Sequence, residues 1–130
     1  MSIEAQVHDQ FKIFVGNVTG TDSGIGTIAD KVARFTAENE VAPKSIGVEY
    51  LEAAQRLVVT LGYRTGGEHY RVSLKPVSLG KTGTWEEGGD FAELERRMGD
   101  AAQTVEKIIC HELFVTTDGE LVMVFMTLAA

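Results

Sequence analysis

A glycine-rich segment near the amino terminus has the residue types and the spacing of a dinucleotide site. Thr19–Gly26 reads Thr-Gly-Thr-Asp-Ser-Gly-Ile-Gly and stands between a candidate strand and a candidate helix. Glycines at such positions let the backbone approach a pyrophosphate at a helix N-terminus, where free N–H groups and the helix dipole favour an anion. Gly24 and Gly26 are therefore candidate ligand-binding residues.

The pattern is similar to the TGxxxGIG signature of short-chain dehydrogenases, but the rest of the chain departs from that family. Those enzymes build a doubly wound parallel sheet of about twice this length, and they need a Tyr-x-x-x-Lys pair. Here Tyr70 precedes Lys75 by five residues, and Gly16-Asn17 interrupts the expected buried strand. We interpret the segment as a flexible loop that needs unusual backbone angles.

A second glycine-rich segment, residues 76–89, contains the only tryptophan of the chain. Its run Leu79-Gly80-Lys81-Thr82 is similar to the end of a P-loop, but Lys75 stands where the first glycine of that motif is required. Nucleotide hydrolysis is therefore not expected. Long loops within compact domains are often functional or mobile, so Lys81 and Trp85 are candidate ligand-binding residues.

Cys110-His111-Glu112 places a thiol, an imidazole and a carboxylate in one short run. Adjacent side chains on a strand point to opposite faces, so Cys110 and His111 are not expected to serve one site. His111 does not open an HExxH motif, because Val115 stands where the second histidine is required. The chain has three histidines and one cysteine, and no metal site is predicted. His111 is either a structural residue or a ligand-binding residue.

Two glutamates stand at equivalent positions of an internal repeat, since Ile46-x-x-Glu49 matches Ile109-x-x-Glu112. If a rough twofold relates the two halves, both carboxylates could converge near its axis. Paired carboxylates do acid–base work when their environments push their pKa values apart. The alternative is that both point to solvent. Glu49 and Glu112 are candidate ligand-binding residues, and no catalytic residue is assigned.

The elements that must position these residues form two similar halves, residues 11–63 and 70–127. Each half reads strand, glycine-rich loop, helix, strand, strand, with its landmarks at a nearly constant offset. The chain of 130 residues has the length of a single domain. The order predicts an α+β two-layer sandwich built by tandem duplication, in which a mostly antiparallel six-stranded sheet carries both helices on one face.

Both predicted helices begin with capping residues at equivalent positions. Thr27 and Asp30 mark the first helix, which is expected to end near Asn39. Asp90 and Glu93 form a capping box for the second, expected over residues 90–104. Apolar stripes suited to packing on a sheet follow at Ile28, Val32 and Phe35, and at Phe91, Leu94, Met98 and Ala102.

Six strands are expected, joined in part by tight turns. Thr65-Gly66-Gly67-Glu68 is interpreted as a hairpin connection between the halves, and Asp118-Gly119 lies in a second hairpin turn. The expected strands are Phe11–Val15, Ile46–Leu51, Leu57–Tyr63, His69–Lys75, Ile108–Val115 and Leu121–Leu128.

The last two strands are apolar on both faces, and helices on one side of a sheet can cover only one of these faces. A third layer or another subunit must cover the other face. A subunit is favoured, because no sequence is left over to build a layer. Exposed Val122, Val124 and Met126 would form a contiguous apolar patch, so we expect a homo-oligomer, with a twofold dimer as the favoured form.

Each half resembles a dodecin subunit in its β-α-β-β order and its length. In the second half, Thr84-Trp85-Glu86-Glu87 precedes the helix, and Ile109-x-x-Glu112, Asp118-Gly119 and a closing apolar strand follow. Dodecins are small flavin-binding proteins that assemble into hollow spheres, and a strand tryptophan holds their flavin. Ile109 or His111 stands at about that position here. The resemblance therefore implies a shared shape, and it carries over neither a functional residue nor a cofactor.

Composition narrows the class of protein further. The formal net charge is −7, with 12 basic and 19 acidic residues, which argues against nucleic-acid and anionic-membrane partners. The single cysteine fits a reducing cytosol, and residues 1–6 lack the features of a secretory signal. We expect a small cytoplasmic, non-catalytic binding or assembly module without a cofactor. The alternative is a small-ligand-binding protein or enzyme that uses the glycine-rich loops 16–27 and 76–89.

Overall fold

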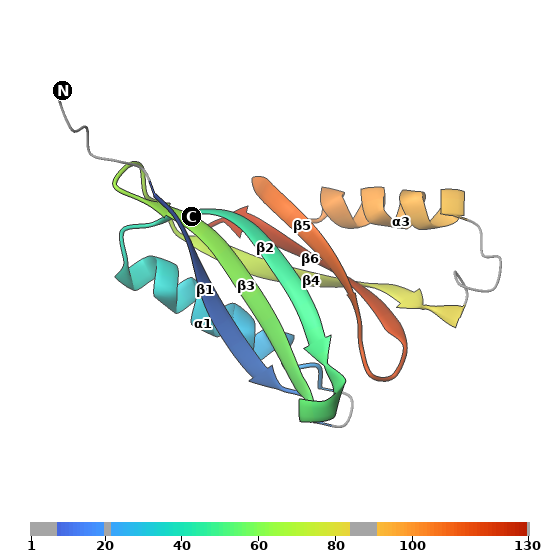
Figure 1. Cartoon of the computed structure of the whole chain (residues 1–130). Helices are drawn as coiled ribbons and strands as arrows, with labels where there is room; N and C mark the ends of the chain where they lie inside the picture. Colours follow the sequence, from blue (N-terminus) through green and yellow to red (C-terminus); the bar gives the residue numbers. More distant parts are fainter. Residues whose placement is uncertain (1–7, 20–21, 84–90, 130) are drawn as a thin grey trace.

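The computed structural model describes residues 8–19, 22–83 and 91–129, and Figure 1 shows how their elements are arranged. Sheet 1 has the strand order β1-β3-β2, and sheet 2 has the order β4-β6-β5; all neighbours are antiparallel. The elements in chain order are β1 (His8–Asn17), α1 (Ile25–Glu38), β2 (Ala42–Leu51), the 3₁₀ turn η1 (Glu52–Ala54), β3 (Arg56–Thr65), β4 (Val72–Lys81), α3 (Phe91–Gln103), β5 (Ile108–Val115) and β6 (Glu120–Leu128).

The α+β class with antiparallel strands is confirmed. Within the described residues each half contributes strand, helix, strand and strand, and the third strand of each half is the centre of its sheet. The expected single six-stranded sheet is wrong, because the strands pair as two three-stranded ladders. β2 and β5 nevertheless lie side by side, so one flank of each sheet adjoins the other. Origin by duplication stays a prediction.

The central strand of sheet 2 is buried on both of its faces. Val122, Val124 and Met126 face the main core, which sheet 1 and α1 complete. Met123 and Phe125 point to the opposite face and pack against α3. Because side chains alternate along a strand, a strand apolar on both faces needs a cover on each side, and both covers come from this chain.

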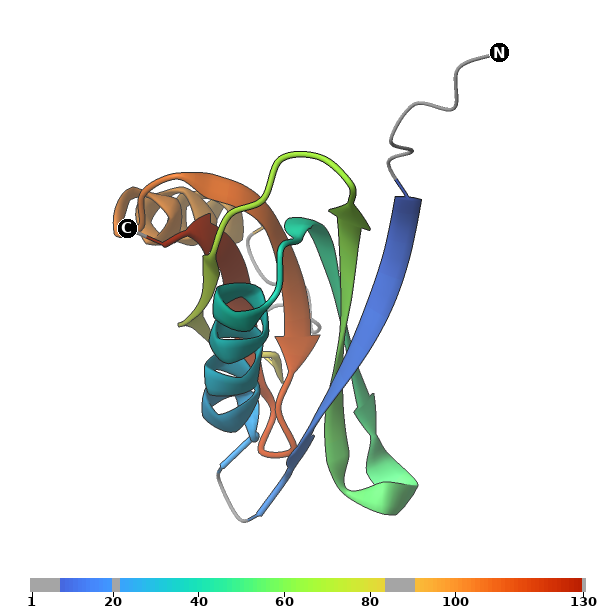
Figure 2. The ribbon, with the colours of Figure 1, turned by 90° about the vertical axis from the view of Figure 1, so that its left-hand side faces the viewer.

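The helices therefore lie on opposite sides of sheet 2, which corrects the prediction that both lie on one face. α1 contacts β1 and β4, the edge strands of the two sheets that lie away from the β2–β5 contact. α3 packs on the face of sheet 2 opposite the main core. Figure 2 shows α1 and sheet 2 on one side of sheet 1, with no described element on its other side. No helix in the described part of the chain has both the length and the apolar character needed to cross a membrane.

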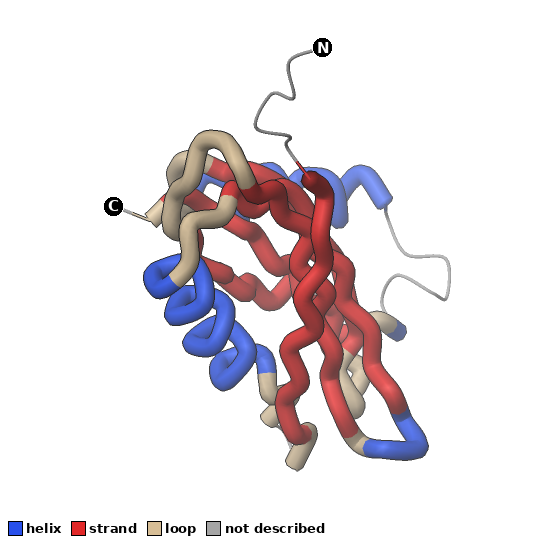
Figure 3. The backbone as a smooth tube through the Cα atoms, turned by 60° about the vertical axis from the view of Figure 1, so that its left-hand side comes forward, coloured by secondary structure: helices blue, strands red, loops and turns tan. Residues whose placement is uncertain are grey.

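α1 begins at Ile25, two residues before the predicted cap Thr27, which is exposed in the first turn. Gly24 sets the start because it adopts φ 84°, a left-handed conformation that glycine tolerates best. The predicted stripe is confirmed at Ile28 and Val32, which are fully buried in the main core. Figure 3 shows α1 running beside the strands of sheet 1.

α3 packs on sheet 2 through Ala101, which is buried, and through the partly buried Leu94, Met98 and Ala102. Phe91, expected in the same stripe, is 62% exposed. The predicted cap Asp90 lies outside the described residues. The guanidinium of Arg96 donates from Nε to Glu93 at 2.9 Å. Hydrogen bonds from Arg96 first and then Arg97, together with their positive charges, lower the pKa of Glu93 to about 2.

The segment between β3 and β4 is not the expected hairpin, because these two strands belong to different sheets. The chain crosses from sheet 1 to sheet 2, and hydrogen bonds from Tyr70 and Val72 fix the segment that leads into β4. Tyr70 N–H donates to the Val41 carbonyl at 3.0 Å, and Tyr70 Oη donates to the Pro43 carbonyl at 2.7 Å. Val72 N–H donates to the buried Thr36 hydroxyl at 3.2 Å, which joins β4 to α1.

The turn at Asp118-Gly119 is confirmed, since it joins the antiparallel strands β5 and β6 and Gly119 adopts φ 81°. The predicted loop over residues 76–89 is wrong for residues 76–81, which continue β4. Pro76 pairs with Val124, and the register shifts between Ser78 and Gly80. The remaining residues of that loop lie outside the described residues from position 84 onwards.

Burial of β6 on both faces gives a direct test of the fold. Phe125 is 1% exposed, and we expect Phe125→Ala to reduce the free energy of unfolding by about 3–5 kcal/mol, because the side chain leaves a cavity between β6 and α3. Phe91→Ala is the control, expected to change stability by less than about 0.5 kcal/mol, since that ring is already exposed. Equal effects of both substitutions in urea unfolding would contradict the placement of α3.

Candidate functional site

The glycine-rich turn before α1 is closed by its own backbone and side chains. A Cβ added at Gly16 would lie 2.6 Å from the Gly24 carbonyl oxygen, so the two glycines allow a close backbone contact. Gly24 N–H donates to Asp22 Oδ1 at 2.9 Å, and Ile25 N–H donates to Ser23 Oγ at 3.4 Å. The Asp22 carboxylate thus stands at the helix N-terminus, where a pyrophosphate would have to bind.

This geometry argues against dinucleotide binding at Gly24 and Gly26. Side chains already accept from two of the first N–H groups, and a carboxylate repels a phosphate at short range. Gly26 is exposed, and a Cβ added there would meet nothing within 4 Å.

We therefore expect no saturable signal when NADH is titrated into the protein to millimolar concentration, followed by calorimetry. The reason is the self-capped turn, which offers the ligand a negative charge in place of free donors. A micromolar affinity that Gly26→Val weakens would contradict this expectation. That substitution adds a side chain in open space and leaves the fold in place.

Lys81 lies at the end of β4 and is engaged by the β5–β6 turn. Its Nζ is 3.3 Å from Asp118 Oδ2 and 3.3 Å from the Asp118 carbonyl oxygen. The Thr116 hydroxyl and Lys81 both donate to this carboxylate and lower the pKa of Asp118. The contacts are exposed, and they brace a hairpin. Trp85, the companion of Lys81 in the predicted second loop, lies outside the described residues.

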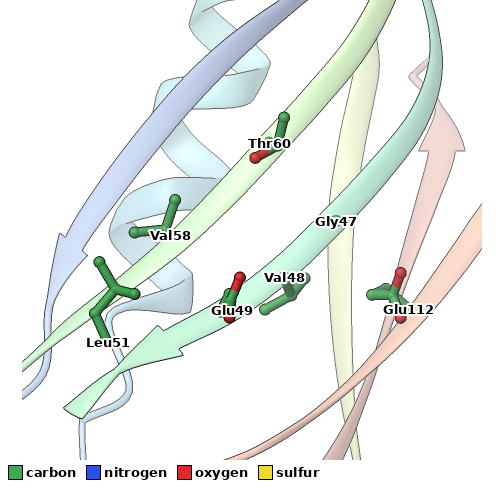
Figure 4. A pocket seen from close by; sticks show the side chains of 7 residues that line it. All are labelled: Gly47, Val48, Glu49, Leu51, Val58, Thr60 and Glu112. Atoms are coloured by element: carbon green, nitrogen blue, oxygen red, sulfur yellow. The ribbon is translucent and has the colours of Figure 1, made fainter.

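Glu49 and Glu112, by contrast, line the same hollow. It has a volume of about 280 Å³ and lies where β2 of sheet 1 adjoins β5 of sheet 2. Figure 4 shows Glu49 on β2 and Glu112 on the neighbouring strand, with Thr60 and apolar side chains around them. The two carboxylates that match in the sequences of the two halves thus line one hollow. The other lining residues are Gly47, Val48, Leu51 and Val58.

Two carboxylates and one hydroxyl could attract a cation or an amine into this hollow. A stable metal site needs more ligands than two carboxylates, and no group of three or more histidine, cysteine, aspartate or glutamate side chains gathers in residues 8–19, 22–83 and 91–129. Glu112 Oε1 also accepts from Leu113 N–H at 3.3 Å. We therefore assign neither a metal nor a ligand to this hollow, which lies at the surface where β2 adjoins β5.

Cys110 and His111 point to opposite faces of β5, as the sequence predicts. Cys110 packs against the main core, where the Ile46 N–H of β2 donates to its sulfur, and His111 is exposed. Burial raises the pKa of the Cys110 thiol, and the negative charge of Glu112 raises that pKa further. His111 does not line the hollow that contains Glu112.

We therefore expect the alkylation of Cys110 by iodoacetamide to reach half its limiting rate at a pH above that of a free cysteine. Glu112→Gln removes a neighbouring negative charge and should lower this midpoint. Glu95→Gln, on the exposed side of α3, serves as the control and should leave the midpoint unchanged. An unchanged midpoint in Glu112→Gln would contradict the placement of Cys110 and Glu112 on one face of β5.

Comparison of the chain with models of protein families, with curated proteins and with solved structures gives no match. The resemblance to dodecin subunits therefore stays a prediction, and functional inference rests on the geometry.

The most prominent exposed feature escaped the sequence analysis. Phe11 and Ile13 of β1 are 70% and 63% exposed. The signal was present, since Phe11, Ile13 and Val15 alternate along a strand whose other face carries the buried Phe14.

Proposed function

We propose that the protein is a non-catalytic assembly module that forms a homodimer through sheet 1. One observation carries the proposal: the face of sheet 1 that points away from the core, here called the outer face, is apolar and no described element covers it. The corresponding sheet 2 has both faces covered, as Phe125 at 1% exposure shows for the side of α3. Contiguous exposed apolar faces of this kind mark interaction sites.

The outer face has a ridge and a trough. Phe11, Ile13 and Val15 of β1 form the ridge. β2 and β3 supply small residues beside it, and the register pairs Gly47 with Thr60 and Ser45 with Gly62. A Cβ at Gly62 would lie 2.4 Å from Ser45 Oγ and 3.4 Å from a Phe11 ring carbon. The Phe11 ring therefore lies close to the part of the trough that Gly62 and Ser45 form.

A second copy of this chain fits such a surface. An isologous contact places the same patch on both partners, so a twofold can set the ridge of one protomer in the trough of the other. Charges stand at the end of the face: Arg64 Nε lies 2.8 Å from Asp9 Oδ1. Glu49 stands toward the other end, because Val15 pairs with Val58 and Val58 pairs with Glu49. The rows between them, from Phe11 to Ile13 and across to Thr60 and Gly47, carry no charge.

The size of the face sets the expected strength of the dimer. Each strand of sheet 1 has 10 residues, and a rise of about 3.3 Å per residue with about 4.8 Å between strands gives a face of roughly 500 Å². Two copies would bury about 1,000 Å², near the lower limit of specific interfaces. The proposed dimer is therefore moderate in affinity and exchanges with monomer.

The site of the proposed dimer differs from the site expected from the sequence. Val122, Val124 and Met126 face the core, so they cannot form an interface in the folded protein. The alternative function, ligand binding by the two glycine-rich loops, loses support, because the first loop is self-capped and residues 76–81 of the second continue β4. We also propose a cytoplasmic location, because the single cysteine is half-buried and a free thiol fits a reducing compartment.

Sedimentation equilibrium should reveal a mass approaching twice 14.1 kDa at tens of micromolar protein. Phe11→Lys should weaken the dimer about a hundredfold or more, because an apolar side chain is worth about 1.5–3 kcal/mol of burial and a twofold counts each change twice. The fold should survive, since Phe11 is 70% exposed.

Phe91→Lys is the matched control, since it makes the same chemical change at a ring that is 62% exposed on α3. It should leave the mass unchanged. A wild-type protein that sediments as a monomer at 100 μM, or a dimer that both substitutions weaken equally, would contradict the proposal.

A further inference from the structure

β1 has an unpaired edge, because in the described residues it pairs with β3 alone. Hydrogen-bonding groups alternate in direction along an antiparallel strand. Val18 N–H, just beyond β1, donates to the Gln55 carbonyl that precedes β3, whereas the Val15 carbonyl accepts from the Lys31 side chain of α1. The backbone groups of Phe11, Ile13 and Val15 therefore point away from β3, toward α1.

A groove of about 450 Å³ follows this edge between β1 and α1. Its floor is apolar: the Phe14 and Phe35 rings meet edge to face with centroids 5.7 Å apart, and Ile13 and Val15 of β1 line its border. Figure 3 shows α1 alongside β1 with the strand at the border of the sheet. A groove between a sheet edge and a helix suits an extended chain, which can add to the sheet through main-chain hydrogen bonds.

The rim of the groove is basic, although the whole chain carries a net charge of −7. Lys12, Lys31 and Arg34 line it, against one acid, Glu38. All four are exposed, and Lys12 Nζ lies 5.9 Å from the centroid of the Phe35 ring. This concentration of positive charge favours an acidic occupant. It disfavours a second copy of this edge, because antiparallel pairing of two β1 strands would bring the basic rims together.

We propose that the groove between β1 and α1 binds an extended acidic peptide segment of another protein, added as a fourth strand to sheet 1. The peptide backbone pairs with Phe11 and Ile13, and alternate carboxylates meet Lys12, Lys31 and Arg34. Lys31 transfers its hydrogen bond from the Val15 carbonyl to a peptide carboxylate, and a peptide N–H takes its place. The proposed dimer uses the outer face of the same sheet, and Ile13 and Val15 of β1 border both surfaces.

A fluorescein-labelled ten-residue peptide that alternates glutamate with valine is the probe, read by anisotropy with the wild-type chain. We expect saturable binding with a dissociation constant below about 1 mM, weakened by added salt. The same peptide with lysine in place of glutamate should not bind. A flat titration with the acidic peptide, or equal binding of the basic one, would overturn the proposal.

The double variant Lys31→Glu with Arg34→Glu should weaken binding about tenfold or more. The matched control is Arg71→Glu with Lys75→Glu, which makes the same change in net charge at two exposed residues outside the groove. Circular dichroism checks that both variants are folded. Equal losses in the two variants would show attraction to overall charge, which overturns the assignment of the site.

Strand addition is tested with the wild-type protein and an altered probe, so that folding is not in question. Methylation of alternate peptide nitrogens removes the donors on one edge of the peptide. We expect two isomeric probes, methylated on opposite registers, to differ: one binds as the parent peptide does, and the other loses binding. Equal binding of both would show that side chains alone hold the peptide, and the proposed strand addition would be wrong.

Discussion

The arrangement of the whole molecule depends on the burial of β6 from both sides. Its run Val122–Thr127 is buried at every position, and each apolar side chain removed from water is worth about 1.5–3 kcal/mol. Because these side chains alternate between faces, no single layer can cover them. Sheet 1 with α1 takes one face and α3 takes the other. Both helices are then committed, which leaves the outer face of sheet 1 without a cover from the described part of the chain.

Local signals predicted the elements well and predicted their packing poorly. β5 has the expected bounds, and Asp118-Gly119 joins it to β6. The end of β4 was missed because Pro76 and Gly80 suggest a loop. Proline is compatible with a strand at the edge of a sheet, and Gly80 follows a shift in register that admits its φ of 107°. Sheet membership depends on contacts far apart in the chain, so local spacing could not reveal it.

The sequence predicted some candidate sites better than others. Glu49 and Glu112 were found because the repeat places them at equivalent positions, and the adjoining strands β2 and β5 bring them to one hollow. The glycine motif before α1 was correctly set aside on its context, and the structure adds the physical reason in the Asp22 carboxylate. Lys81 was selected from a loop motif, but its partner is Asp118, on a turn that is distant in sequence.

β1 shows how one strand can present separate surfaces for separate partners. The side chain of Phe14 lies in the core, and those of Phe11 and Ile13 stand on the outer face. The backbone groups of the odd-numbered residues point to the groove beside α1, at right angles to the side chains. A partner on the outer face therefore contacts side chains, whereas a partner at the edge binds the backbone groups and the basic rim. Ile13 and Val15 belong to the ridge and also line the groove, so the two surfaces adjoin, whereas the basic side chains of the rim belong to the groove alone.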